Sequence, residues 1–98
     1  MADGSPSMTG KRVRSLRLHL GLSKSKIAWL LQTGESSIAA VERGSRTVPN
    51  RWVPWLIAME RAGPRAIRKL KPCFPSRYPG LEHAGNLIAA WRIILELA

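Results

Sequence analysis

The chain contains a single cysteine, few acidic residues and no long apolar run, and each shortage excludes a class of protein. One cysteine, Cys73, excludes an internal disulfide framework and a zinc site built from several cysteines. The longest apolar stretches, 38–41 and 87–91, fall far short of the roughly 18 residues that a membrane-spanning helix needs. Residues 1–10 lack the apolar run of a secretory signal. These absences predict a cytoplasmic protein with no membrane partner.

Acidic residues are also scarce relative to basic ones. Six Asp and Glu stand against 16 Lys and Arg, so the formal net charge is +10. Such an excess is commonly offset by a polyanion, either nucleic acid or an acidic membrane face, because like charges repel within a compact chain. A basic surface that only keeps the protein soluble is the alternative. Hydrophobic residues make up 45% of the chain, which favours one small folded domain over a disordered basic tail.

Strand signals are missing as well, because no alternating run of β-branched residues is bounded by Asn-Gly turns. Apolar residues instead recur at helical spacing, which predicts an all-α fold. Gly21 and Gly44 are placed to end helices, and Ser23 is placed to cap one. The predicted helices span residues 11–20, 24–31, 35–42, 51–62 and 81–98, with one further turn over the basic residues 65–71.

These segments suggest a division of the chain into four parts. The parts are a flexible arm over 1–9, a compact helical domain over 10–63, a basic proline-rich linker over 64–80 and an amphipathic helix over 81–98.

Helices 24–31 and 35–42 are separated by a three-residue break, and the small residue Ala28 lies in the middle of the first. This pattern describes a helix-turn-helix, in which closely crossing helices need a small residue. The chain here resembles the repressor/Cro-like helix-turn-helix family, often called XRE. The resemblance covers about residues 8–61 and rests on LSKSKIA at 22–28, SSI at 36–38 and VERG at 41–44.

The resemblance implies a compact four- to five-helix repressor-like domain with an extra C-terminal helix. It also implies that helix 24–31 lies across the DNA backbone while helix 35–42 enters the major groove. The positions that match base-reading residues are Glu35, Ser36, Ser37, Ala39 and Ala40. Those that match phosphate-binding residues are Ser23, Lys24, Arg43 and Arg46. Arg17 and Glu42 match positions that pair with each other inside the fold.

The chain departs from the family pattern at two positions of the turn. Gln32 replaces the usual glycine and Gly34 replaces the usual Ser or Thr cap, so we expect a looser or distorted turn. The reading face 35–40 also lacks an Arg or Asn for bidentate base contacts. Specificity would then come from close approach, DNA shape or the arm before Lys11.

The last helix carries an apolar stripe that a lone helix cannot hide from water. Its members are Leu81, Ala84, Ile88, Trp91 and Leu95. The stripe packs either on its own domain or on a second chain, and we favour a homodimer because repressor-type domains bind two half-sites as pairs.

Other candidates have ordinary structural explanations. The spacing of Trp29, Trp52 and Trp55 favours core positions over base stacking. His19 and His83 have no partner ligands at metal-binding spacing, so we expect no metal or cofactor. The sequence leaves open whether one basic cluster binds phosphate or is merely solvated: Arg65, Arg68, Lys69 and Lys71.

Together these features predict a DNA-binding transcriptional regulator, a dimeric repressor of bacterial or phage type. We expect no enzymatic activity, because no nucleophile-base pair or carboxylate dyad is evident. One alternative is an antitoxin that represses its own operon while the rest of the chain binds a toxin protein. A second alternative is a non-specific basic RNA-binding protein.

Overall fold

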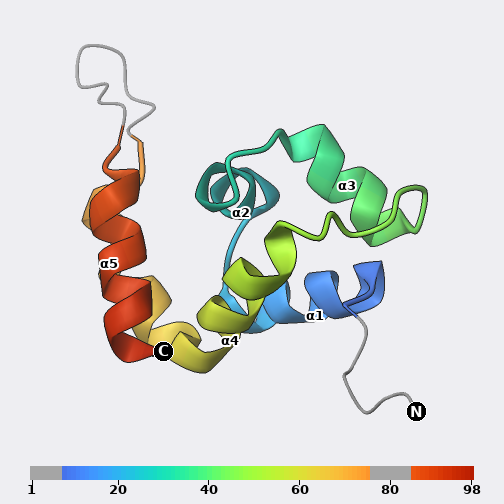
Figure 1. Ribbon diagram of the computed structural model, residues 1–98. Coiled ribbons are helices and arrows are strands. Elements are labelled where there is room, and N and C mark those ends of the chain that lie inside the picture. The colour runs from blue at the N-terminus through green and yellow to red at the C-terminus, as the bar shows by residue number, and fades with distance from the viewer. Residues whose placement is uncertain (1–7, 76–84) are drawn as a thin grey trace.

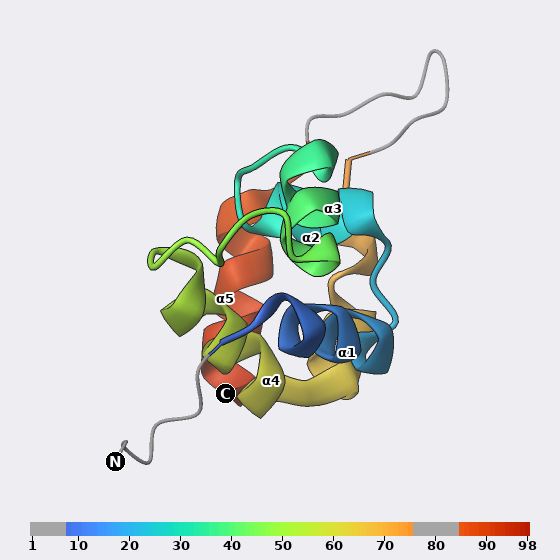
Figure 2. The same ribbon diagram turned by 90° about the vertical axis from the view of Figure 1, so that its right-hand side faces the viewer.

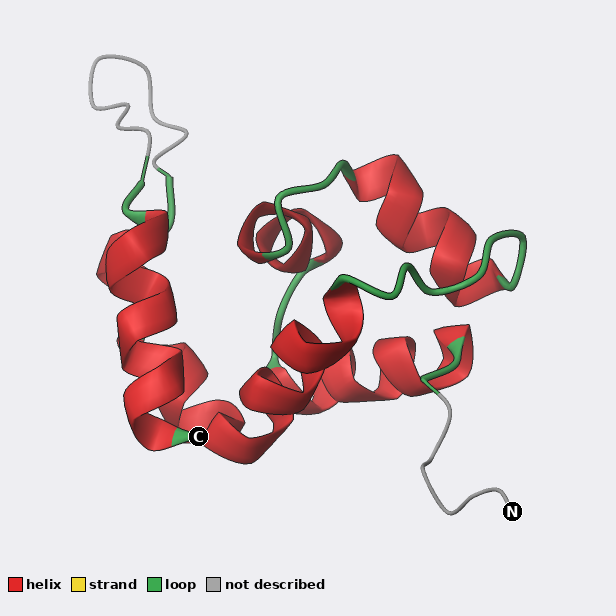
Figure 3. Cartoon of the chain, viewed as in Figure 1, coloured by secondary structure: helices red, strands yellow, loops and turns green. Residues whose placement is uncertain are grey.

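The computed structural model describes residues 8–75 and 85–98 (Figure 1). These residues fold into helices joined by short loops, with no strand among them, so the predicted all-α fold is confirmed (Figure 3). The helices are α1 (Gly10–Leu20), α2 (Lys24–Leu30), α3 (Glu35–Arg43), α4 (Trp52–Lys69) and α5 (Leu87–Leu97), with a 3-10 turn η1 (Lys71–Cys73). None of the described helices has the length and apolarity that a membrane span requires.

Side-chain caps explain where the first two helices begin. The Thr9 hydroxyl accepts a hydrogen bond from the Arg12 amide at 3.1 Å, and the Ser23 hydroxyl accepts one from the Lys26 amide at 3.1 Å. Each cap satisfies an amide that the helix itself leaves free, which stabilises a helix by about 1 kcal/mol. The predicted arm therefore ends before Thr9, and its residues 1–7 lie outside the described residues.

The apolar stripes of α1 to α4 meet in one core, as their spacing predicts. In this core α1 packs against α3 and α4, and α2 packs against α3. Its most deeply buried side chains include Val13, Ile27, Leu30, Ile38, Val41, Trp52, Leu56 and Met59.

The fourth helix bends at Gly63 and continues beyond it. Gly63 has φ 79° and ψ 178°, which interrupts the helical backbone immediately before Pro64. After the bend, Ala66, Ile67 and Leu70 are buried. The structure therefore corrects the predicted linker over 64–80: its first part is helical and belongs to the core. The further helical turn predicted over 65–71 is present as the continuation of α4, but the basic residues between the apolar ones concealed its burial in the core. Residues 76–80 of the predicted linker lie outside the described residues.

The last helix begins at Leu87, where the Asn86 side chain accepts a hydrogen bond from the Ala89 amide at 3.0 Å. It packs mainly on α4 and also contacts α2 and η1, so it closes over its own domain (Figure 2). Trp91 is buried and its indole N–H donates to the Leu30 carbonyl at 3.0 Å.

This packing corrects one member of the predicted dimer stripe. Trp91 belongs to the chain's own core, whereas Ile88 and Leu95 are 75% and 57% exposed. Leu81 and Ala84 lie outside the described residues. The stripe divides because the face that covers α4 is centred on Ala90 and Ile94, which are fully buried, rather than on the predicted positions.

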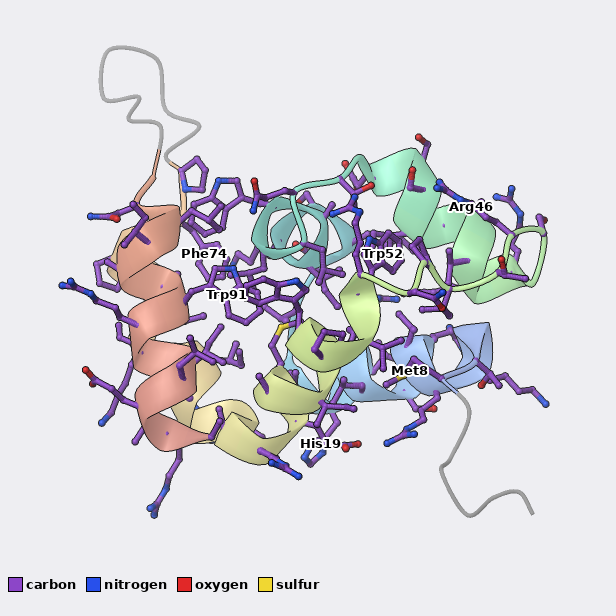
Figure 4. The ribbon with its side chains drawn as sticks, viewed as in Figure 1. Met8, His19, Arg46, Trp52, Phe74 and Trp91 are labelled. Carbon is purple, nitrogen blue, oxygen red and sulfur yellow. The ribbon has the colours of Figure 1, made fainter. Side chains whose placement is uncertain are left out.

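The three tryptophans predicted to be in the core differ in burial. Trp52 is fully buried and Trp29 is half-buried against Phe74, with ring centroids 5.3 Å apart. Trp55 was predicted to be in the core but is 40% exposed, and it meets Trp91 edge to face at 4.4 Å. Figure 4 shows Trp91 pointing from α5 towards the interior, while Phe74 lies beside α2.

Candidate nucleic-acid interface

The turn between α2 and α3 holds Gln32 in the left-handed backbone region. Its φ is 55°, and it is the only non-glycine residue of the described chain with positive φ. The amides of Gln32 and Thr33 donate to the carbonyls of Trp29 and Ala28 at 3.1 and 2.9 Å. The turn is thus closed by hydrogen bonds rather than loose, although Gln32 adopts a conformation that costs a residue with a Cβ about 1–2 kcal/mol.

The start of α3 has no side-chain cap. Gly34 occupies the cap position with φ −89° and ψ 155°, a backbone conformation that any residue can adopt. Glu35 follows in the first turn, where its negative charge interacts favourably with the helix dipole. The departure from Ser or Thr at position 34 therefore removes a hydrogen bond without changing where the helix begins.

The outward face of α3 carries Ser36 and Arg43. They lie seven residues apart, so two helical turns bring them to the same side. Both are exposed, while Ile38 and Val41 on the opposite side are fully buried. Because α3 extends one residue beyond the predicted range 35–42, Arg43 is the last residue of the helix itself.

The other predicted base-reading residues differ in accessibility. Glu35 is exposed, but Ala39 and Ala40 are half-buried. Ser37 accepts a hydrogen bond from the Arg46 guanidinium at 3.0 Å, so a predicted base-reading residue is bound to a predicted phosphate-binding residue. Arg46 lies near the outer edge of α3 (Figure 4).

The start of α2 provides the second group of predicted phosphate contacts. Lys24 is exposed, and no carboxylate of the described residues lies within ion-pair distance of it. The Ser23 hydroxyl caps the helix and also lies 3.1 Å from the Ser25 hydroxyl. In Figure 2 the start of α2 and the loop after α3 lie on opposite sides of α3.

The predicted pair of Arg17 and Glu42 is formed. Arg17 Nε and Nη2 donate to Glu42 Oε2 and Oε1 at 2.7 and 3.0 Å, and Nη1 donates to the Leu22 carbonyl at 3.1 Å. The hydrogen bonds to Glu42 raise the pKa of Arg17 above its ordinary value, so the guanidinium stays charged. Both side chains are largely buried, which makes this pair a structural link between α1 and α3.

Two residues of this region were missed by sequence reasoning. A Cβ on Gly10 would collide with the Val41 carbonyl oxygen, so α1 approaches the end of α3 as closely as only glycine allows. Arg51 donates through Nη1 to the Leu31 carbonyl at 3.1 Å and thereby ties the end of α2 to the start of α4. Neither contact has a local sequence signal, because each joins residues 20 or more positions apart in the chain.

Comparison of the chain with protein-family models, characterised proteins and solved structures finds no significant match.

Proposed function

We propose that the protein is a sequence-specific double-stranded DNA-binding transcriptional regulator that acts in the cytoplasm as a repressor of bacterial or phage type. The observation that carries the proposal is the outward face of α3, which runs from Ser36 to Arg43 and lies between the start of α2, with the exposed Lys24, and the loop that carries Arg46. A single helix fits the major groove of B-DNA, which is about 12 Å wide. The flanking cations would then bind the phosphates on either side.

The buried side of α3 supports the same assignment. Ile38 and Val41 hold the helix on the core, and the Glu42 carboxylate is occupied by Arg17. The outward residues therefore project from a helix that is fixed on the core. Contacts with nucleobases need such positioning to discriminate between DNA sequences. Only Glu35 and Ser36 among the predicted base-reading residues are exposed, so we assign them the leading part in base recognition.

The phosphate role is tested with Lys24→Ala. A duplex is first selected from a random pool by the full-length protein, and affinity is then measured for that duplex and an unrelated one across a salt series. We expect Lys24→Ala to weaken both duplexes and to lower the salt slope by about one, because one phosphate contact is lost. Arg92→Ala is the matched control, since it removes the same charge from an exposed position of α5, which packs on α4. A loss confined to the selected duplex would contradict the phosphate role.

The base-reading role is tested with Ser36→Ala on a series of single-base-pair changes. We expect the preference at one position of each half-site to change by about 1–3 kcal/mol while the affinity for unrelated duplexes stays nearly constant. Structured RNA at equal salt is the counter-test, because the A-form major groove is too narrow for α3. Equal affinity for that RNA would favour the non-specific RNA-binding alternative.

We further propose that two copies bind one DNA site as a homodimer, with Ile88 and Leu95 as the contact. These residues lie seven positions apart on the exposed side of α5, so a two-fold antiparallel arrangement sets Ile88 of one copy against Leu95 of the other. The eleven residues of α5 span only about 16 Å, too little for the roughly 1,000 Å² of a stable interface. We therefore expect monomers in dilute solution and pairs on DNA.

The pairing is tested by stoichiometry. We expect two copies of the wild-type chain on a selected duplex with two half-sites, and one copy of the Ile88→Glu variant at the same concentration. Two copies of that variant would exclude α5 as the contact.

A further inference from the structure

A groove of about 380 Å³ opens on the surface of the molecule, and no residue of α3 lines it. One wall is the end of α1 with the start of α2, and the other is the part of α4 beyond the Gly63 bend with η1. Its apolar surface comes mainly from Phe74 and Pro64, which are half-buried, and the edges of the buried residues Leu20, Leu22 and Ile67 add a smaller part.

The rim of this groove is basic. Lys26, Arg68 and Lys71 line it together with His19, and none of the described residues that line it is acidic. No carboxylate of the described residues pairs with Lys26, Arg68 or Lys71. The three cations thus repel one another around one hollow, and an anion placed there would relieve that repulsion.

One cation of the rim also contacts an aromatic side chain of the groove. The Lys26 ammonium lies 5.1 Å from the centroid of the Phe74 ring, within the range of a cation-π interaction. Phe74 in turn packs on Trp29. Lys26 is therefore held beside the apolar surface of the groove instead of extending freely into solvent.

We propose that this groove binds a small organic anion with an apolar body, of the class of medium-chain carboxylates. The apolar surface distinguishes this class from inorganic phosphate or a DNA backbone, since neither has an apolar part to cover it. The volume lies in the range of about 300–1,000 Å³ that is usual for small-molecule pockets. It is too small for a protein helix about 10 Å across and several turns long.

Occupancy of the groove would oppose DNA binding, a consequence that rests on the proposed function. Lys26 lies two residues after Lys24 on α2, so an anion bound there lowers the positive potential where a phosphate would bind. By linkage, DNA would weaken anion binding by the same factor. Binding of the anion itself does not depend on any role in DNA recognition.

The binding is tested by titrating the isotope-labelled full-length protein with octanoate and following backbone amide shifts. Octanol serves as the probe without charge, and acetate as the probe without an apolar body. We expect saturable shifts from octanoate centred on residues 19–22, 26 and 67–74, and at least tenfold weaker effects from the other two probes. Equal binding of acetate would overturn the role of the apolar surface, and equal binding of octanol would overturn the role of the cations.

Variants locate the site. Arg68→Gln and Lys71→Gln should each raise the octanoate dissociation constant about tenfold, because each removes a charge-assisted contact. Lys69→Gln is the matched control: it lies between them in sequence and does not line the groove, so it should leave octanoate binding unchanged. An equal loss in Lys69→Gln would overturn the proposal, since only the overall charge would then matter.

A final measurement separates the two proposals. With octanoate binding established, saturating octanoate should weaken binding of the selected duplex about fivefold or more. Unchanged DNA affinity would overturn the coupling, and absence of DNA binding would overturn the proposed function, while octanoate binding stands in either case. Shifts of the groove amides by DNA, with none from octanoate, would instead assign the groove to phosphate.

Discussion

At the scale of single residues, the α2–α3 turn places Gln32 in a backbone conformation that is unfavourable for a residue with a Cβ. Its left-handed backbone suits glycine, and the turn keeps its hydrogen bonds with glutamine in place. The neighbouring carbonyl of Leu31 is bound by Arg51, which supports the turn from α4. The surrounding structure therefore imposes the conformation that the residue itself disfavours.

We predict that Gln32→Gly raises the free energy of unfolding by about 0.5–1 kcal/mol, because relief of the left-handed strain exceeds the added entropy of the unfolded chain. Urea unfolding followed by circular dichroism measures the change. Gln32→Ala, which keeps a Cβ, should give no gain. A loss of stability in Gln32→Gly would show that the turn carries no such strain.

The close approach at Gly10 supports a second prediction. Gly10→Ala should lower the free energy of unfolding by about 1–3 kcal/mol, because its Cβ would collide with backbone of α3 and force the two helices apart. Gly34→Ala is the control, since its Cβ would meet only the Ser36 hydroxyl at 3.7 Å and its φ is negative. Thermal melts of the two variants should differ clearly, and equal melting temperatures would refute the steric argument.

At the scale of elements, the link between α1 and α3 is ionic as well as apolar. We predict that Glu42→Ala lowers the free energy of unfolding by about 3–5 kcal/mol, since it leaves the largely buried Arg17 charge without its partner. The double variant Arg17→Met with Glu42→Leu removes both charges and should recover much of this loss. Denaturant unfolding of the wild type, Glu42→Ala and the double variant measures these free energies. A double variant that is less stable than Glu42→Ala would contradict this explanation.

At the scale of the whole molecule, α5 completes the core instead of extending from it. Trp91 joins α5 to α2 through its hydrogen bond with Leu30 and to α4 through its contact with Trp55. The α2–α3 unit therefore depends for its stability on a helix far away in the sequence. A substitution that weakens the packing of α5 should therefore also lower the stability of the candidate interface, because both share this core.

We predict that Trp91→Ala lowers the free energy of unfolding by about 3–5 kcal/mol, whereas Ile88→Ala on the exposed side of the same helix changes it by less than about 0.5 kcal/mol. Calorimetry should show a single transition for Trp91→Ala at lower temperature. Two separate transitions, with the α2–α3 unit melting as in wild type, would show that α5 forms an independent part.

Several features follow from the sequence alone. Helical periodicity and capping residues were sufficient for α1 to α3, because the 3.6-residue repeat and the Ser23 cap are local properties. The pairing of Arg17 with Glu42 followed from the family resemblance, and the structure contains it. The charge excess and the departures at Gln32 and Gly34 are likewise visible in the sequence.

Only the tertiary structure decided what covers each apolar face. Periodicity shows that a helix has an apolar stripe but not which surface packs on it, so Trp91 was expected in an interface between chains and lies in the chain's own core. The same ambiguity concealed the burial of Ala66, Ile67 and Leu70 in the core and the partial burial of Ala39 and Ala40. The Gly10 approach and the basic groove arise from contacts between distant segments, which no local pattern encodes.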